Sequence, residues 1–336
     1  MTELQSAASE NATVAGRGCP LHYRYPAAAL AGPAALTTDT LYVVGGLYGN
    51  PLALDALLRL AARETQTPAI VFNGDFNWFD IDPAGFLQIN QAVLRHTALR
   101  GNVETELAGD DSEAGCGCAY PDHVGDAEVE YSNRILKQLR TTARAFPGLR
   151  QRLAGLSMHL TADVGGVRIG IVHGDAESLA GWGFAHDALA EPGNTAKFAR
   201  WFAAAQVRVF ACSHTCLPAL REFALAGGKG LVINNGAAGM PNFSGTRFGV
   251  ITRVGLGPAP AGSVLYGSRI DGVHVDALRL EYGHDAWVRQ FLANWPEGSP
   301  AHSSYFRRIM SGPTFSPEQA FGTAISHTIE QERRIG

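Results

Sequence analysis

The pattern of apolar and polar positions in the first third of the chain alternates between strands and helices. An apolar run at 41–45 leads through a glycine-rich turn into a leucine-rich helix that we expect at 51–64. A second continuous apolar run at 68–74, typical of a buried parallel strand, precedes a helix expected at 82–98 with proline near its start. A very short strand or strand end follows at 98–102. This alternating order predicts an α/β fold.

Beyond residue 102 the pattern becomes richer in strands. The further expected elements are a long loop at 107–126, a helix at 131–146, a hairpin at 156–175 that turns at Gly165-Gly166, a helix at 194–206, strands at 207–215 and 230–237, and three antiparallel strands within 247–282. A chain that begins as alternating α/β and then becomes β-rich predicts one domain with two packed sheets covered by helices.

The chain divides into three expected parts, and it shows no internal repeat. Residues 1–36 form an N-terminal extension, and residues 37–283 form the main domain, with a loop-helix insertion at 104–157. Residues 284–336 form a helical and coil extension that we expect to pack on the same domain. Within it, residues 295–308 are more typical of a surface extension than of a lid over a pocket.

Composition narrows the classes of function. The 336 residues are 46% apolar, which allows a substantial core, and the net charge of −4 argues against a nucleic-acid partner. No apolar run approaches the ~20 residues needed to span a bilayer, and the N-terminus lacks a basic-then-apolar signal pattern. We therefore expect a cytoplasmic protein without a membrane partner, and the oligomeric state stays open.

The cysteines do not suggest a disulfide framework, because their number is odd and no signal pattern precedes them. Reduced thiols, mostly buried as small apolar side chains, are the default interpretation. The five residues are Cys19, Cys116, Cys118, Cys212 and Cys216.

Polar residues follow four of the expected strands directly. A carboxylate, an amide and two imidazoles stand at these junctions, and each alone is a weak signal because turns and helix caps use the same residues. Together they match the ligands that a first-row divalent cation prefers. The four residues are Asp75, Asn102, His173 and His214.

These junctions resemble the motifs of the calcineurin-like metallophosphoesterase superfamily. The matching segments, in the order that the family has them, are "GLYGNPLALDALL", "FNGDF", "LRGNVE", "IVHGD" and "CSHTCLP", and together they cover roughly residues 40 to 245. The resemblance implies a two-sheet β-sandwich flanked by helices. It also implies hydrolysis of a phosphate mono- or diester on a small phosphorylated substrate, with one or two divalent transition-metal ions (Zn, Fe or Mn) as cofactor. The implied ligands and catalytic residues are Asp75, Asn102, His173 and His214.

The chain departs from the family pattern at one of the two implied metals. Gly46 and Tyr48 stand where the first motif has aspartate and histidine, and Cys216 replaces the second histidine of the last motif. All three departures concern the same metal. Val103 also stands where the family often has a histidine that acts as an acid.

Three interpretations of the metal site with the altered ligands stay open. In the first, one metal at the four retained residues activates water. In the second, a further metal is held by Cys216, with Tyr48, Cys116 or Cys118 as additional candidate ligands, and thiolates would favour Zn or Fe. In the third, the scaffold is catalytically silent and binds a ligand or a protein.

Some weaker candidates lie near the third and fourth motifs. Asp175 either hydrogen-bonds a ligand imidazole or caps the next turn. Trp182, Phe184 and His186 follow the His173 turn and are candidates for a pocket wall.

Overall fold

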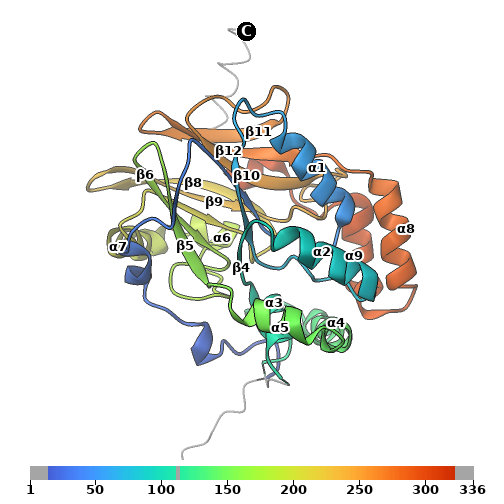
Figure 1. Ribbon diagram of the computed structural model, residues 1–336. Helices are drawn as coiled ribbons and strands as arrows, with labels where there is room; N and C mark the ends of the chain where they lie inside the picture. Colours follow the sequence, from blue (N-terminus) through green and yellow to red (C-terminus); the bar gives the residue numbers. More distant parts are fainter. Residues whose placement is uncertain (1–13, 111–113, 322–336) are drawn as a thin grey trace, which may run out of the picture.

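Two six-stranded sheets face each other and carry helices on their outer sides (Figure 1). The computed structural model describes residues 14–110 and 114–321. The expected structure at 1–13, 322–336 and 111–113 lies outside the described residues. This arrangement confirms the predicted two-sheet sandwich. In the described part of the chain, no helix combines the length and the apolar character that crossing a membrane requires.

The first sheet has the order β11-β12-β10-β2-β3-β4. Its strands β2, β3 and β4 run parallel, and β10 and β12 continue the sheet in antiparallel pairing. The bounds are Thr40–Val44 for β2, Ala69–Asn73 for β3, Thr97–Leu99 for β4, Gly249–Gly255 for β10, Val264–Ile270 for β11 and Val273–Leu280 for β12.

The second sheet has the order β1-β5-β6-β7-β9-β8, in which β6, β7 and β9 run parallel. The predicted hairpin is present as β5 and β6, which turn at Gly165-Gly166. The bounds are Leu36–Thr37 for β1, His159–Val164 for β5, Val167–Val172 for β6, Val209–Cys212 for β7, Pro218–Leu225 for β8 and Gly228–Asn235 for β9.

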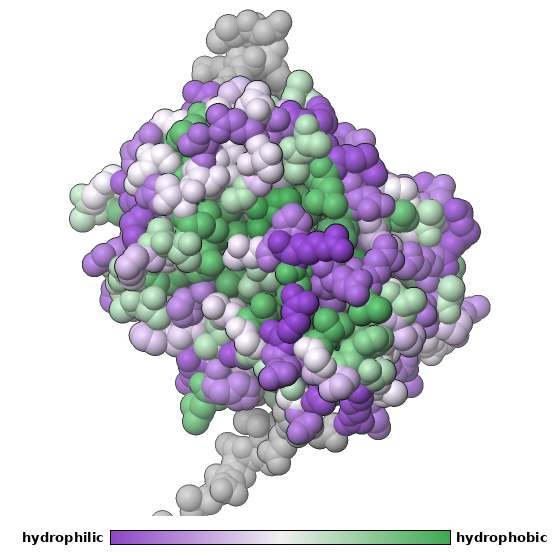
Figure 2. Space-filling view, in the orientation of Figure 1, coloured by the Kyte–Doolittle hydropathy of each residue, from purple (hydrophilic) through white to green (hydrophobic). Residues whose placement is uncertain are grey.

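The central strands are mostly apolar because both of their faces are buried, although β10 also buries Thr252 and Arg253. Successive side chains of a strand point to opposite faces. In β2, Leu41 and Val43 point into the core between the two sheets, whereas Tyr42 and Val44 pack under the helices of the first sheet. Figure 2 shows apolar residues gathered near the middle of one face of the molecule, with polar residues around them.

The first α-helix, α1, begins where the sequence supplies a cap. The Asn50 side chain accepts hydrogen bonds from the amides of Leu52 and Ala53, both at 3.0 Å, and Pro51 follows at the first helical position. These residues start α1.

The bounds of the α-helices, in chain order, are α1 Pro51–Ala61, α2 Pro83–Val93, α3 Asn102–Ala108, α4 Asp126–Arg144, α5 Pro147–Ala154, α6 His186–Ala190, α7 Thr195–Ala205, α8 His284–Asn294, α9 Pro300–Ser311 and α10 Pro317–Phe321.

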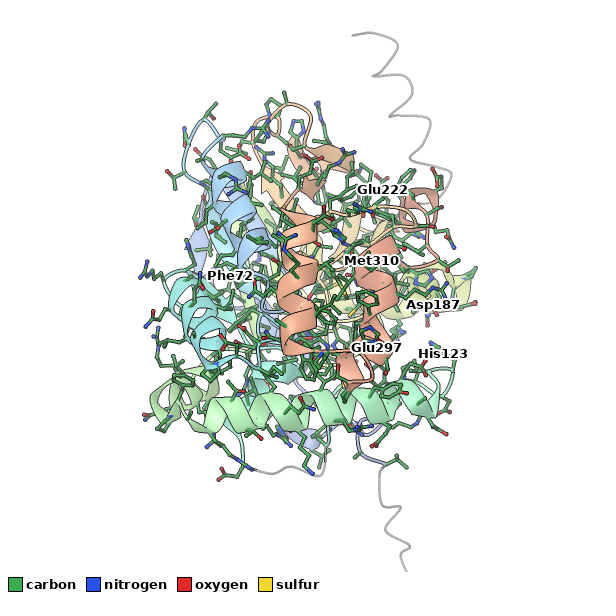
Figure 3. The ribbon with its side chains drawn as sticks, turned by 90° about the vertical axis from the view of Figure 1, so that its right-hand side faces the viewer. Phe72, His123, Asp187, Glu222, Glu297 and Met310 are labelled. Atoms are coloured by element: carbon green, nitrogen blue, oxygen red, sulfur yellow. A yellow bond between two sulfur atoms is a disulfide. The ribbon has the colours of Figure 1, made fainter. Side chains whose placement is uncertain are left out.

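The C-terminal helices pack on the first half of the molecule. Figure 3 shows α8 and α9 side by side above α4, with Glu297 in the turn between them and His123 beyond the start of α4. Trp287, Phe291 and Trp295 of this region are buried in the same core as α1 and α2. On the other sheet, α7 covers the outer face.

The sequence missed several elements. Residues 102–108, expected to be a strand end and the start of a loop, form α3. The helix expected at 131–146 begins earlier, at Asp126, and both α5 and β8 were not anticipated. For β8 the reason is physical. Its first part is buried on both faces and its second part alternates, so neither strand pattern extends over the whole of it.

Candidate metal centre and pocket

Four polar residues meet where parallel strands of the two sheets end. Asp75 follows β3, Asn102 opens α3 after β4, His173 follows β6 and His214 follows β7. All four side chains are buried, with exposed fractions from 0% for His173 to 6% for Asp75 and His214. We call these four residues the strand-end cluster. The sequence predicted that they would converge, and the structure brings them together.

Their ligand atoms lie close around His173. Nε2 of His173 is 3.2 Å from Oδ1 of Asn102, 3.3 Å from Oδ2 of Asp75 and 3.2 Å from Nδ1 of His214. The ligand atoms of Asp75, His173 and His214 all lie within 4.8 Å of one another. One cation fits such a group, because N–metal and O–metal bonds are about 2 Å long.

The hydrogen bonds around the cluster turn lone pairs inward. The other ring nitrogen of His173, Nδ1, donates to the carbonyl oxygen of Asn73 at 2.8 Å, and Nε2 of His214 donates to that of Cys118 at 3.0 Å. The amide nitrogen of Asn102 donates to the carbonyl oxygen of Cys116 at 2.9 Å, which turns its oxygen toward His173. Four acceptor atoms therefore face each other, and this donor set fits a bound cation.

The contacts within the cluster set the protonation of its members. Burial lowers the pKa of His214 to about 4, with a further contribution from His173, so His214 is neutral near pH 7. Burial by itself would raise the pKa of Asp75, but His173 brings it below its usual value. Burial lowers the pKa of His173, but Asp75 raises it above its usual value, so a proton and a dication compete for Nε2 of His173 beside the anionic carboxylate.

A strained turn holds Asp75 in place. Asp75 has a φ of 54° and Gly74 a φ of 81°, and a Cβ on Gly74 would lie 2.5 Å from the amide nitrogen of Gly101. Only glycine therefore allows β3 and the turn after β4 to approach this closely.

Glu104, which the sequence analysis missed, binds both of these turns. Its carboxylate accepts hydrogen bonds from the amides of Asp75 at 2.7 Å, Phe76 at 3.0 Å and Gly101 at 3.0 Å. Burial raises the pKa of Glu104 to about 7, and Asp75 adds to the effect. A glutamate at the third position of a helix that bonds back to the residue before the helix is a capping pattern. The spacing in "GNVE" could have revealed it.

The loop before α4 contacts the cluster through its backbone rather than through its sulfur atoms. Cys116 and Cys118 are joined by a disulfide, so the interpretation of five reduced thiols is wrong for this pair. The carbonyl oxygen of Cys118 accepts hydrogen bonds from His214 and, at 3.0 Å, from the indole of Trp182. Sulfur atoms bonded to each other are not thiolate ligands.

Tyr48 and Cys216, which stand where the resemblance implies ligands of a second metal, contact each other. The Tyr48 hydroxyl lies 2.9 Å from the sulfur of Cys216, and burial raises the pKa of both groups. A Cβ on Gly46 would lie 3.0 Å from the Tyr48 ring. Cys216 is not part of the group of metal-ligating atoms formed by Asp75, His173 and His214. The tyrosine ring thus occupies the space where an aspartate at position 46 would project.

A cavity of about 230 Å³ opens beside the cluster. Asp75, Asn102 and His214 form part of its wall, and Tyr48 and Cys216 form another part. The remaining wall comes from several aromatic rings and from α4 and α9; it includes Trp78, Val103, Cys118, Tyr120, Val124, Glu128, Ser132, Trp182, Thr215, Ser304, Tyr305 and Arg308.

Of the weaker candidates from the sequence, some line the cavity and others do not. Trp182 lines the cavity, but Phe184 belongs to the core under α7, and His186 packs against Phe315 at 4.9 Å between ring centroids. Asp175 caps its own turn by accepting from the amides of Glu177 and Gly183, both at 3.0 Å. The segment 295–308 also differs from expectation. It is no mere surface extension, because α9 supplies part of the cavity wall.

Comparison with known proteins places the fold. No protein-family model matches the sequence, and no curated protein is significantly similar to it. The structure is similar to that of the hypothetical protein PH1004 from Pyrococcus horikoshii OT3, with a TM-score of 0.55 and 16% identity over 82% of this chain and 99% of that chain.

Two further solved structures show weaker similarity. A metallophosphoesterase from Sphaerobacter thermophilus has a TM-score of 0.48 and 17% identity, over 82% of this chain and 100% of that chain. A conserved uncharacterized protein from Streptococcus pneumoniae TIGR4, described as a predicted phosphoesterase, has a TM-score of 0.36 and 14% identity, over 73% of this chain and 91% of that chain. At such identities the likeness concerns the fold alone.

Proposed function

Because the chain has the calcineurin-like metallophosphoesterase fold, we propose that it is a metal-dependent phosphoesterase with one metal ion held by the strand-end cluster. One observation carries this proposal. Two imidazole nitrogens, an amide oxygen and a carboxylate oxygen face one another at the ends of strands from both sheets. In the same fold without a metal, only a proton on His173 would lie between these buried acceptor atoms; burial lowers the pKa of His173, but Asp75 raises it above its usual value.

The metal would be Zn, Fe or Mn, held by Asp75, Asn102, His173 and His214. Such an ion supplies Lewis acidity and lowers the pKa of water toward ~7. The protein orients the ligands. Asn73 and Cys118 fix the two imidazoles through their carbonyl oxygens, and Glu104 holds the turn that carries Asp75.

The substrate is a small phosphorylated molecule that enters the cavity beside the cluster. Hydrolysis breaks the bond between phosphorus and the alcohol oxygen and forms a bond between phosphorus and the oxygen of water. The leaving alcohol takes up a proton. Arg308 lines the same cavity and offers a positive charge to the phosphate.

The main alternative is a catalytically silent protein that keeps the scaffold and binds a ligand or another protein. The Tyr48–Cys216 contact favours it to a degree, because it fills the place of the second metal. The strand-end cluster argues for activity, because a scaffold that only binds a partner does not need converging metal ligands.

Elemental analysis of the purified protein, combined with assays on an aryl phosphate and an aryl diester, tests the proposal. The assays are run with added Mn, Fe and Zn. We expect about one metal ion per chain and metal-dependent release of phenol. A protein that retains metal but hydrolyses neither ester with any of the three ions would favour the silent alternative. A protein without any metal affinity would contradict the metal centre itself.

A further inference from the structure

Segments outside the two sheets form the wall of the cavity that lies beside the strand-end cluster. Glu128 and Ser132 come from α4, and Ser304, Tyr305 and Arg308 come from α9. These two helices pack against each other and lie close together in Figure 3. Part of the cavity wall is therefore built by two helices that lie outside the strand-end motifs.

The cavity is walled by two pairs of aromatic rings. The ring centroids of Tyr120 and Trp182 are 5.9 Å apart, and those of Trp78 and Tyr305 are 6.4 Å apart in an edge-to-face arrangement. All four residues line the cavity. Aromatic rings prefer other flat rings as neighbours, in stacked or edge-to-face geometry. The walls thus favour a ligand that carries a flat ring.

One fixed cation lies in the same wall. The guanidinium of Arg308 donates from Nη2 to the carbonyl oxygen of Cys216 at 2.5 Å and from Nε to that of Pro241 at 3.2 Å. These bonds fix the side chain, and the group lines the cavity together with Asp75 and His214. Arginine is well suited to bind a phosphate, since its planar fork matches the phosphate oxygens.

The volume of the cavity indicates the size of ligand that suits it. Pockets for drug-sized molecules usually measure about 300–1,000 Å³. At about 230 Å³, this cavity is smaller than that range. A cavity of this size suits a monoester with a single ring better than a diester with two large groups.

We propose that this cavity binds a small phosphate monoester whose alcohol carries a single aromatic ring, with Arg308 on the phosphate and the two aromatic pairs on the ring. This inference rests on the proposed phosphoesterase function for its chemistry, but not for its binding preference. Tyr305 and Trp182 are then specificity-determining residues.

Binding of two non-hydrolysable phosphonates tests the preference without relying on activity. Benzylphosphonate and cyclohexylmethylphosphonate carry the same charge and have the same number of ring atoms, but only the first has a flat ring. Calorimetry on the Zn-loaded protein should give a Kd about tenfold lower for benzylphosphonate, as expected for stacking of this kind. Equal Kd values, or tighter binding of the cyclohexyl compound, would overturn the inference.

Variants of the aromatic residues in the cavity wall test whether these residues cause the preference for benzylphosphonate. Tyr305→Leu should reduce the ratio of the two Kd values to threefold or less, and Phe306→Leu, at the neighbouring position of α9, should leave it unchanged. Because Tyr305 also packs against Phe79, at 5.0 Å between ring centroids, its variant is checked by thermal unfolding. Trp182→Leu provides a second test if Tyr305→Leu does not fold. An unchanged ratio in folded variants would contradict the assignment.

The turnover of two phosphate monoesters distinguishes a failure of this inference from a failure of the proposed function. Benzyl phosphate and cyclohexylmethyl phosphate both release a primary alcohol, so their chemical reactivities are similar. A higher kcat/KM for benzyl phosphate supports both proposals. Equal kcat/KM values would sink the inference and leave the phosphoesterase function standing. Absence of turnover with Mn, Fe and Zn, together with preferred binding of benzylphosphonate, would sink the proposed function and leave the inference standing.

Discussion

The hydroxyl oxygen of Tyr48 lies 2.9 Å from the sulfur of Cys216. These residues come from opposite sheets, and each stands where the resemblance implies a histidine ligand of a second metal. The Tyr48 ring also fills the space beside Gly46, as the 3.0 Å approach of a Cβ at that position shows. At the three positions where the resemblance implies ligands of a second metal, the residues present therefore fit one another: Tyr48 contacts Cys216, and its ring fills the space beside Gly46.

Binding of a second metal should require substitutions at all three positions, 46, 48 and 216. Cys216→His alone should leave the metal content at about one ion per chain, because the Tyr48 ring still occupies the site. The triple variant Gly46→Asp, Tyr48→His, Cys216→His should approach two ions. Elemental analysis after loading with Zn and desalting measures both. The aspartate at position 46 is tolerable although φ is 64° there, since aspartate adopts this conformation more readily than most residues. A second ion in the single variant would mean that Tyr48 does not block the site.

The sequence predicted the convergence of the strand-end cluster well, because two physical rules apply to it. Continuous apolar runs mark buried parallel strands, and the ends of parallel strands meet at one edge of a sheet. Asp75 and His173 stand directly after such runs. These rules bring together strand ends within one sheet. The meeting of Asp75 with His173, which follow strands of different sheets, depends in addition on the packing of the two sheets, and only the family resemblance implied it.

The cavity wall could not be predicted in the same way. Tyr305 and Arg308 reach the site because α9 folds back over the first sheet, and nothing in their local sequence specifies that path. The Cys116–Cys118 loop likewise contributes carbonyl oxygens, which any residue type supplies, so residue identity carries no signal. The pairing of Tyr48 with Cys216 depends on contact between two sheets. Local patterns contain no information on such distant contacts.

Removal of the central imidazole should abolish metal retention. His173 lies within 3.3 Å of the ligand atoms of the other three members of the cluster, so His173→Ala removes the group around which they gather. We expect the metal content after desalting to fall at least about tenfold, since even residues that only orient a ligand often change affinity by 10–100-fold. His302→Ala, on α9 and outside the cluster, is the control. Unchanged metal content in His173→Ala would remove the site assignment.

Glu104 should affect both stability and metal affinity. In Glu104→Gln, one carboxylate oxygen becomes an amide nitrogen, which cannot accept hydrogen bonds. Depending on the orientation of this amide, the backbone amides of Asp75 and Gly101 or that of Phe76 lose their acceptor. An unsatisfied buried group costs about 1–3 kcal/mol, so the free energy of unfolding should fall by that amount. The Kd for Zn should rise, because the turn that carries Asp75 loosens. Glu130→Gln, on the exposed side of α4, should change neither quantity. A Kd for Zn equal to that of the unaltered protein would show that Glu104 does not position Asp75.

Asp80 should make the protein less stable as the pH rises. Its side chain is 1% exposed, one carboxyl oxygen has no hydrogen-bond partner within the described residues, and burial raises its pKa to about 8, with a further contribution from Asp82. The folded state therefore keeps a proton that the unfolded state loses near pH 4. Since the folded state binds more protons between pH 4 and 8, the free energy of unfolding contributed by Asp80 decreases over this window and stays low above it.

The isosteric variant Asp80→Asn isolates this contribution. Its free energy of unfolding in urea should exceed that of the unaltered protein by up to about 5 kcal/mol at pH 8.5, and the difference should shrink as the pH falls toward 5. Asp55→Asn, at an exposed position of α1, should show no such trend. A difference that stays constant between pH 5 and 8.5 would contradict the raised pKa of Asp80.

The cysteines of the loop before α4 provide the sharpest test of how the metal is held. The double variant Cys116→Ala, Cys118→Ala should retain about one metal ion per chain, because Asn102 and His214 bond to the backbone carbonyl oxygens of these residues and not to their sulfur atoms. Alanine preserves those carbonyl groups. Its thermal stability should fall, since a disulfide restricts the unfolded chain. Elemental analysis of the double variant beside Cys212→Ala, a buried cysteine under α7, decides the question. Loss of metal from the double variant alone would show that the sulfur atoms are ligands, and it would replace the one-metal oxygen and nitrogen centre with a thiolate centre.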